Sequence, residues 1–315
     1  MIRKYLYGTP FPTNAVVTDI PPSTEQLPFF ETDSKGTFTY PLQNEDIVYG
    51  LGEQIRGINK RGWQYVSWNS DNPNHQEDTR SLYGAHNFIL ISGRQTFGAF
   101  FDNPGRMEFD IGYTHGNRMQ IRAEKNDLTV YIITGQDEKH IVKQFRQLIG
   151  RSYIPPFWAF GYGQSRWGYQ NEQDVRQVTQ QYQAAGIPLD SIYLDIDYME
   201  RYKDFTVDPK RFPDLGKLVQ DMRTQGIRLV PIIDAGVKIE TGYDVYQEGV
   251  AHNYFCKNAE GKDFVGAVWP GRVHFPDFLQ PEARDWFGKK YAVLTDLGIE
   301  GFWNDMNEPA IFYTE

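Results

Sequence analysis

The second half of the chain alternates between apolar strands and amphipathic helices, and this alternation restricts its possible folds more than any other feature. The predicted strands are residues 159–163, 191–197, 228–234 and 301–305, and the predicted helices are residues 172–185, 215–224 and 281–297. Residues 235–280 are predicted to be irregular. Strands that are joined through helices form parallel sheets. The sequence therefore predicts a β/α fold in this half of the chain.

Carboxylates follow three of the four predicted strands: Asp195 and Asp197, then Asp234, then Asp305. Active sites lie at the C-terminal ends of the strands in a β/α barrel, and a doubly wound sheet also places ligands there. No glycine-rich phosphate loop follows the first strand, which counts against a nucleotide-binding sheet. A complete barrel needs about 250 residues. We therefore expect residues 157–315 to form the first half of a (β/α)8 TIM barrel, with the rest of the barrel missing.

The first part of the chain has short strands with frequent glycine, proline and asparagine turns. This pattern predicts an antiparallel β-sandwich over residues 1–137, with a hairpin about Lys125–Asp127. Residues 138–156 are predicted to be a linking helix and the entry to the barrel. The helix is indicated by apolar residues at helical spacing, namely Ile141, Val142, Phe145 and Leu148.

Charge and cysteine content exclude several classes of partner. The net charge is −9 and the pI about 5.3, whereas nucleic-acid binding needs a basic surface. No apolar run is long enough to cross a membrane. Cys256 is the single cysteine, so no internal disulfide is possible, and the first residues do not resemble a signal peptide. We therefore expect a cytoplasmic protein without nucleic-acid or membrane partners.

Acids that converge at one mouth of a barrel suit a sugar-binding site, especially with indole rings nearby. Trp167, Trp269 and Trp303 lie in the same predicted loops and strand ends. Carboxylates accept hydrogen bonds from hydroxyls, and one of them can attack an anomeric carbon. Metal binding would favour histidines among the acids, but His252 and His274 show no paired ligand spacing. We expect no metal and no cofactor, while other barrel chemistry stays open.

Four motifs resemble glycoside hydrolase family 31. They are QSRWGYQNEQDV at 164–175, YLDIDYMERYKDFTVDPKRFPD at 193–214, VWPGRVHFPDF at 268–278 and WNDMNEP at 303–309. They occur in the order typical of that family. The resemblance implies a retaining α-glucosidase that acts on α-glucoside oligosaccharides or disaccharides and needs no cofactor.

The resemblance also implies roles for single residues. Asp305 matches the catalytic nucleophile, and Glu308 is expected to support its loop. Asp195 matches the acid that binds the far hydroxyls of the non-reducing sugar, with Ile196 as an apolar wall. Asp197 is expected to be structural, because alternate residues of a strand face opposite sides. The other implied substrate-binding residues are Asp71 (with Asp78 as a rival), Trp167, Ile232, Asp234, Trp269, Trp303 and Met306.

Two departures from the family pattern matter. Asn304 stands where the family usually has an apolar residue, and the family's second acid, which lies well downstream of the nucleophile, is absent because the chain ends first. We therefore expect the C-terminal half of the same protein to supply the acid/base Asp, and residues 1–315 to be inactive alone. An α-xylosidase is the first alternative, and an α-glucan lyase would share the nucleophile. A non-catalytic carbohydrate-binding barrel and a metal-dependent enzyme are alternatives from other classes.

Overall fold

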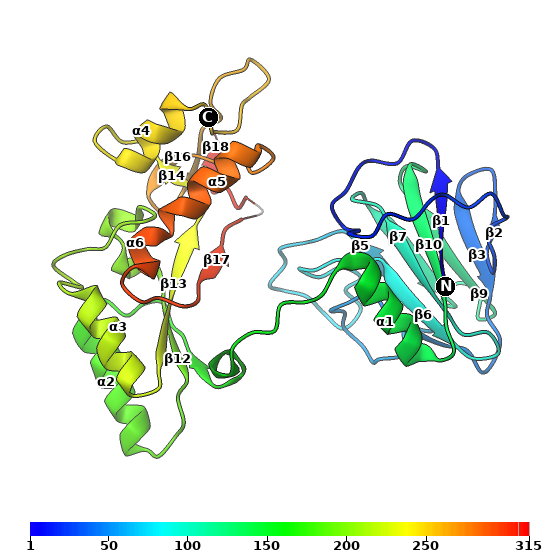
Figure 1. Cartoon of the computed structure of the whole chain (residues 1–315), viewed down its shortest axis with the longest axis horizontal. Coiled ribbons are helices and arrows are strands. Elements are labelled where there is room, and N and C mark those ends of the chain that lie inside the picture. The colour runs from blue at the N-terminus through cyan, green and yellow to red at the C-terminus, as the bar shows by residue number, and fades with distance from the viewer. Residues whose placement is uncertain (308, 315) are drawn as a thin grey trace. The chain divides into compact units, whose positions relative to one another are not determined.

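The computed structural model describes residues 1–307 and 309–314 (Figure 1). The chain divides into two compact units, Met1–Tyr153 and Ile154–Glu315. Each unit has its own buried core. Among the described residues, no helix has both the length and the apolar character that a membrane span requires.

The first unit contains two antiparallel five-stranded sheets, with strand orders β1-β10-β7-β6-β4 and β2-β3-β9-β8-β5. The first sheet consists of β1 (Ile2–Tyr7), β4 (Ile47–Gly50), β6 (Phe88–Ser92), β7 (Phe97–Asp102) and β10 (Leu128–Thr134). The second consists of β2 (Glu31–Thr32), β3 (Thr37–Pro41), β5 (Trp63–Ser67), β8 (Met107–Ile111) and β9 (Arg118–Ala123). Alternate residues of both sheets enter one core, for example Phe38 and Phe109 from one and Phe97 and Phe101 from the other. The predicted β-sandwich is therefore confirmed.

The predicted hairpin about Lys125–Asp127 is wrong. β9 pairs with β3 and β8, whereas β10 pairs with β1 and β7 in the other sheet. The intervening turn therefore crosses from one sheet to the other. A short turn shows that the chain reverses, but the apolar faces of the two strands decide which neighbours each one pairs with.

The helix that sequence analysis assigned to a linking segment is part of the first unit. It is α1 (Glu138–Ile149), and the side chain of Asp137 caps it by accepting from the backbone N–H of His140 at 2.7 Å. Ile141 and Leu148 are fully buried against the outer face of the first sheet. Phe145 stacks on Phe88 of β6, with ring centroids 3.9 Å apart. This face of the sheet is thereby covered.

The second unit is built on a parallel sheet with the order β11-β12-β13-β17. The strands are β11 (Gly163–Gln164), β12 (Ser191–Leu194), β13 (Arg228–Asp234) and β17 (Trp303–Asp305). The helices are α2 (Glu172–Ala184), α3 (Leu215–Thr224), α5 (Pro281–Lys290) and α6 (Ala292–Thr295). Four parallel strands that alternate with helices confirm the first half of a (β/α)8 barrel.

Three predicted elements have different bounds in the structure. The first predicted strand, residues 159–163, begins within the short helix η1 (Phe157–Phe160), and only its last residue belongs to β11, because the Pro155-Pro156 entry leads into a turn rather than an extended run. The second strand stops at Leu194, and η2 (Ile196–Tyr198) and η3 (Glu200–Tyr202) follow. The last predicted helix is divided at Tyr291 into α5 and α6.

The stretch 235–280, expected to be irregular, contains regular elements. These are β14 (Val237–Lys238), α4 (Asp244–Ala251), β15 (Gly266–Val268) and β16 (Gly271–His274). Together with β18 (Tyr313–Thr314), the strands form a small antiparallel sheet in the order β14-β16-β15-β18. This sheet supports the turn between β15 and β16.

Candidate active site

Two acids stand side by side at the C-terminal ends of neighbouring strands. β13 and β17 pair in parallel, with Asp234 opposite Asp305 and Ile232 opposite Trp303. Side chains alternate along a strand, so these four lie on one face of the sheet. Asn304 lies on the other face, where it accepts a hydrogen bond from the Tyr291 hydroxyl at 2.8 Å. The unusual Asn304 is therefore directed away from the acids.

Asp305 is partly buried and is held by the backbone that follows it. Its Oδ1 accepts a hydrogen bond from the Met306 N–H at 2.9 Å. Met306 has φ +61, a left-handed conformation that turns the chain sharply after the strand. Met306 packs against the buried cluster of Val268, Val273 and Phe275, at and beside the small sheet. Glu308, predicted to support this loop, lies outside the described residues.

Asp195 lies where β12 ends and caps η2, with Oδ1 accepting from the Ile196 N–H at 2.8 Å. Burial raises the pKa of Asp195, and the charges of Asp197 and Asp305 add to that rise. Asp197 is buried and pairs with Arg211 at 3.1 Å. The structural role expected for Asp197 therefore fits, but strand alternation was the wrong reason, because residues two apart in a strand face the same side and because this segment is helical.

Asp234, the last residue of β13, is buried. Burial, together with the charges of Asp305 and Asp195, raises its pKa to about 7. We call Asp195, Asp234 and Asp305 the carboxylate cluster. The mutual electrostatic influence of its three members means that they share one small region. Such a cluster can accept several hydrogen bonds from sugar hydroxyls while one member attacks carbon.

Exposed aromatic rings lie on the loops of the same unit. Trp167, in the loop after β11, is 63% exposed, and its ring centroid is 5.4 Å from that of Trp269. Trp269 lies in the turn between β15 and β16, and Phe312 packs edge-on against it at 5.0 Å. We call Trp167, Trp269 and Phe312 the aromatic row. Sequence reasoning missed Phe312, although an apolar pair directly after the Asp305 motif was a signal for it.

The remaining predicted wall residues are more enclosed. Trp303 is partly buried and meets Tyr193 edge-on, with ring centroids 6.3 Å apart. Ile196 and Ile232 are fully buried in the core of the second unit. Contact of these residues with a sugar stays a prediction.

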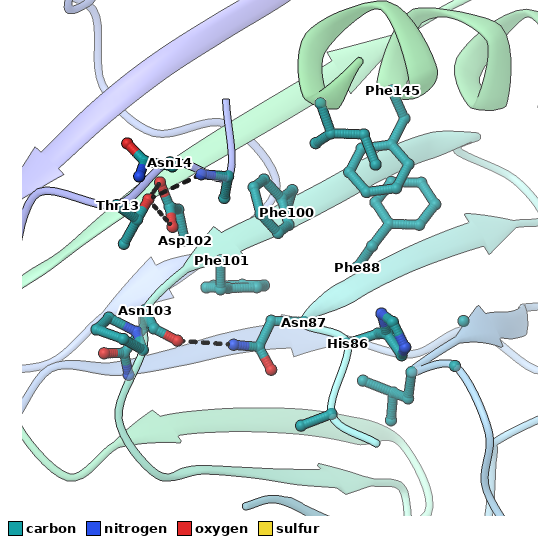
Figure 2. Close-up of a pocket in the computed structure, with 17 residues that line it drawn as sticks. Thr13, Asn14, His86, Asn87, Phe88, Phe100, Phe101, Asp102, Asn103 and Phe145 are labelled. Carbon is teal, nitrogen blue, oxygen red and sulfur yellow. Dashed lines mark hydrogen bonds between the residues drawn. The ribbon is translucent and has the colours of Figure 1, made fainter. Parts of the chain in front are cut away.

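The first unit carries Asp71 and a concavity of its own. Asp71 and its rival Asp78 are exposed in the loop between β5 and β6, and the role of either residue toward a substrate stays a prediction. Figure 2 shows a cavity of about 770 Å³, lined in part by Phe100, Asp102 and Asn87. None of the predicted site residues lines this cavity. Across residues 1–307 and 309–314, no group of three or more His, Cys, Asp or Glu side chains is arranged to hold a metal ion.

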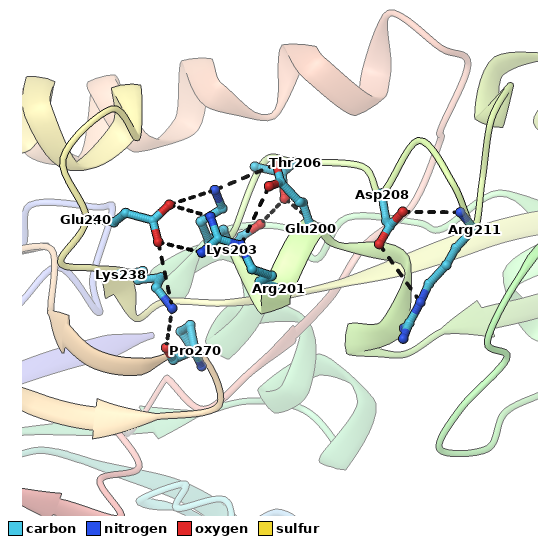
Figure 3. Close-up of polar contacts among 9 residues, drawn as sticks. All are labelled: Glu200, Arg201, Lys203, Thr206, Asp208, Arg211, Lys238, Glu240 and Pro270. Atoms are coloured by element: carbon cyan, nitrogen blue, oxygen red, sulfur yellow. Dashed lines mark hydrogen bonds and ion pairs between the residues drawn. The ribbon is translucent and has the colours of Figure 1, made fainter.

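An ion-pair network links the segments that follow β12 and β13 (Figure 3). The carboxylate of Glu240 accepts from Arg201 at 2.9 Å and from Lys203 at 3.1 Å. Lys238 lies 3.9 Å from Glu240 and donates to the backbone oxygen of Pro270 at 2.9 Å. The segment after β12, the segment after β13 and the β15–β16 turn are thus joined. Loops that are joined by ion pairs and hydrogen bonds hold their side chains in place better than loops without such contacts.

Comparison with known proteins places both units in one family. Residues 152–315 match the glycosyl hydrolases family 31 TIM-barrel domain, and residues 17–110 match the glycosyl hydrolase 31 N-terminal galactose mutarotase-like domain. The chain is 44% identical to Alpha-glucosidase 2 of Bacillus thermoamyloliquefaciens over 86% of its length and 35% of that protein. It is 32% identical to lysosomal alpha-glucosidase of Mus musculus over 92% of its length and 31% of that protein.

A solved structure agrees with these matches. The Flavobacterium johnsoniae GH31 dextranase complexed with glucose superposes with a TM-score of 0.79 at 30% identity. The superposition covers 90% of this chain and 35% of the dextranase. The chain therefore spans about a third of the length of each of these three relatives.

Proposed function

Because this chain belongs to glycoside hydrolase family 31, we propose that it is the nucleophile-bearing part of a retaining α-glucosidase. Asp305 is the nucleophile, and the substrate is an oligosaccharide with a terminal α-linked glucose. The observation that carries this proposal is the register that sets Asp305 beside Asp234 at the ends of β17 and β13. Relatives named as α-glucosidases and a dextranase favour glucose over xylose as the sugar.

The proposed reaction has two steps. An Asp305 oxygen attacks the anomeric carbon, the bond to the leaving-group oxygen breaks, and an acid gives that oxygen a proton. The product is a glycosyl ester of Asp305. A water molecule then attacks the same carbon, gives its proton to the group that acted as acid, and frees Asp305. Asp195 and Asp234 bind hydroxyls of the glucose throughout.

The acid/base carboxylate is proposed to come from polypeptide outside residues 1–315. Four parallel strands are half of the eight in a barrel, and the chain spans about a third of its relatives. We expect purified residues 1–315 to show no turnover of an aryl α-glucoside. Turnover by that polypeptide alone would place the acid/base within it and contradict this part of the proposal.

The main experiment replaces the nucleophile in the complete enzyme. Asp305→Asn should lower kcat at least about 10⁴-fold, because the glycosyl-enzyme intermediate cannot form without the carboxylate nucleophile. A 5-fluoro glycosyl fluoride should label Asp305, and peptide mapping would locate the label. The control is Asp285→Asn, which changes an exposed acid on α5.

Two outcomes would contradict the assignment. Activity of Asp305→Asn near that of the wild type would exclude Asp305 as nucleophile. Glucoside binding without any turnover by the wild-type enzyme would instead support a non-catalytic carbohydrate-binding barrel.

A further inference from the structure

Asp204 is a fully buried acid to which the proposed reaction gives no role. It follows η3 and is 1% exposed. Its Oδ1 accepts a hydrogen bond from the backbone N–H of Asp234 at 3.1 Å. Its backbone oxygen accepts from the Tyr243 hydroxyl at 2.7 Å. Asp204 is therefore in direct contact with the residue that ends β13 and belongs to the carboxylate cluster.

The surroundings of Asp204 disfavour a charge there. The ionisable groups that interact with it electrostatically are Asp234, Tyr198, Tyr243 and Tyr291. The ammonium group of the adjacent Lys203 pairs instead with Glu240 at 3.1 Å. Among residues 1–307 and 309–314, Asp204 has no ion pair with Lys, Arg or His. Burial, followed by the charge of Asp234, raises the pKa of Asp204 well above its ordinary value.

Two carboxylate oxygens in this contact lack partners. Asp204 Oδ2 and Asp234 Oδ1 are both buried without a hydrogen bond in the described part of the chain. Buried polar atoms are rarely left unpaired. Two ionised carboxylates cannot pair, since both only accept, but a protonated carboxyl donates one hydrogen bond. A proton on one of the two carboxyl groups would supply the donor that such a pair needs.

We propose that Asp204 is a positioning residue, held as a neutral carboxylic acid, whose O–H donates a hydrogen bond to the carboxylate of Asp234. This bond fixes the orientation of the Asp234 carboxylate toward the sugar. It also stabilises the charged form of Asp234 against the repulsion of Asp195 and Asp305. The role in sugar binding rests on the function proposed above, whereas the proton on Asp204 does not.

Two variants of the complete enzyme separate this role from simple packing. Asp204→Asn is neutral and keeps one donor and one acceptor, so kcat/KM for an aryl α-glucoside should stay within about twofold of wild type, with the same pH profile. Asp204→Leu has a similar size but cannot donate. Its kcat/KM should fall about tenfold or more, and the acid limb of the profile should move to higher pH. The limb moves up because Asp234, without the donor, binds its proton more tightly.

The opposite shift would overturn the proposal. If Asp204 is charged in the wild type, Asp204→Asn removes a negative charge beside Asp234 and lowers the pKa of Asp234. The acid limb of the Asn variant would then move to lower pH.

Infrared spectroscopy tests the proton without relying on activity or on the Leu variant. At about pH 8.5, where most carboxyl groups are ionised, the wild type should show the carbonyl band of a protonated carboxyl. Asp204→Asn should lose this band, and Asp214→Asn, which changes an exposed helix-capping acid, should keep it. A wild type without the band would contradict the proposal. An enzyme that shows the band but hydrolyses no α-glucoside would contradict only the proposed function.

Discussion

At the residue scale, the aromatic row is a continuous set of three rings on the loops of the second unit. Trp269 contacts both Trp167 and Phe312, and all three rings are considerably exposed. An exposed ring can cover the apolar face of a sugar, and its size decides which neighbouring sugar orientation fits. Because Trp167 lies at the end of this row, in the loop after β11, we predict that it lines the leaving-group side.

Trp167→Tyr should change the preference between linkages. The smaller ring alters the surface on which the leaving sugar packs, so the ratio of kcat/KM for α-1,4 and α-1,6 disaccharides should change about threefold or more. Initial-rate measurements on the two disaccharides give this ratio. Trp63→Tyr, on β5 of the first unit, is the control and should leave it unchanged. An unchanged ratio in the Trp167 variant would place Trp167 outside the leaving-group subsite.

At the element scale, α1 depends on a narrow buried stripe rather than on all its apolar residues. Ile141 and Leu148 are fully buried, whereas Val142 is 41% exposed, although both Ile141 and Val142 fit an apolar pattern. The space under Ile141 is provided by Gly98 and Gly135, where an added Cβ would lie 2.8 and 3.0 Å from its side chain. The helix therefore packs closely on the sheet at this point.

Ile141→Ala should lower the free energy of unfolding by about 2–4 kcal/mol, because it leaves a cavity under α1. Val142→Ala, one residue along the same helix, should change it by about 0.5 kcal/mol. Urea unfolding followed by far-ultraviolet circular dichroism would measure both. Equal losses for the two variants would mean that α1 does not pack on the sheet in this orientation.

At the scale of the whole molecule, buried acids make stability depend on pH. Asp234 has an ordinary pKa of 3.8 and a folded-state pKa of about 7, so the folded protein binds its proton more tightly than the unfolded chain. The stability that this proton contributes is complete below about pH 4 and is lost as the pH rises to about 7. The pKa values of other acids, such as Asp221 and Glu240, are lowered by their ion pairs. The stability that these acids contribute is lost as the pH falls below about 4.

The melting temperature should therefore fall as the pH rises from about 5 to about 8. The corresponding loss in free energy of unfolding is on the order of a few kcal/mol. Asp234→Asn, which cannot ionise, should remove the part of this slope that Asp234 contributes, whereas Asp204, whose pKa is also raised, contributes the same way in both proteins. Calorimetry of both proteins across the range would measure it. A wild-type slope that the Asn variant reproduces would show that Asp234 titrates normally in the folded state.

The sequence by itself determined the features that depend on neighbouring residues. Apolar runs and helical spacing predicted the parallel strands. The acids that directly follow these runs were therefore predicted to lie at the strand ends. Asp234 and Asp305 were therefore predicted at strand ends and are found there. The motif around Asp305 identified the family, because a contiguous motif keeps its residues together whatever the rest of the fold does.

Only the tertiary structure decided the features that depend on contacts between distant segments. β9 and β10 are neighbours in sequence but pair in different sheets, because burial of their apolar faces outweighs the short turn between them. The segment at Asp197 leaves the strand early, so its burial could not follow from strand alternation. Asp204 resembles any loop acid in the sequence. Its role arises only because folding removes it from water and brings it against Asp234, 30 residues away.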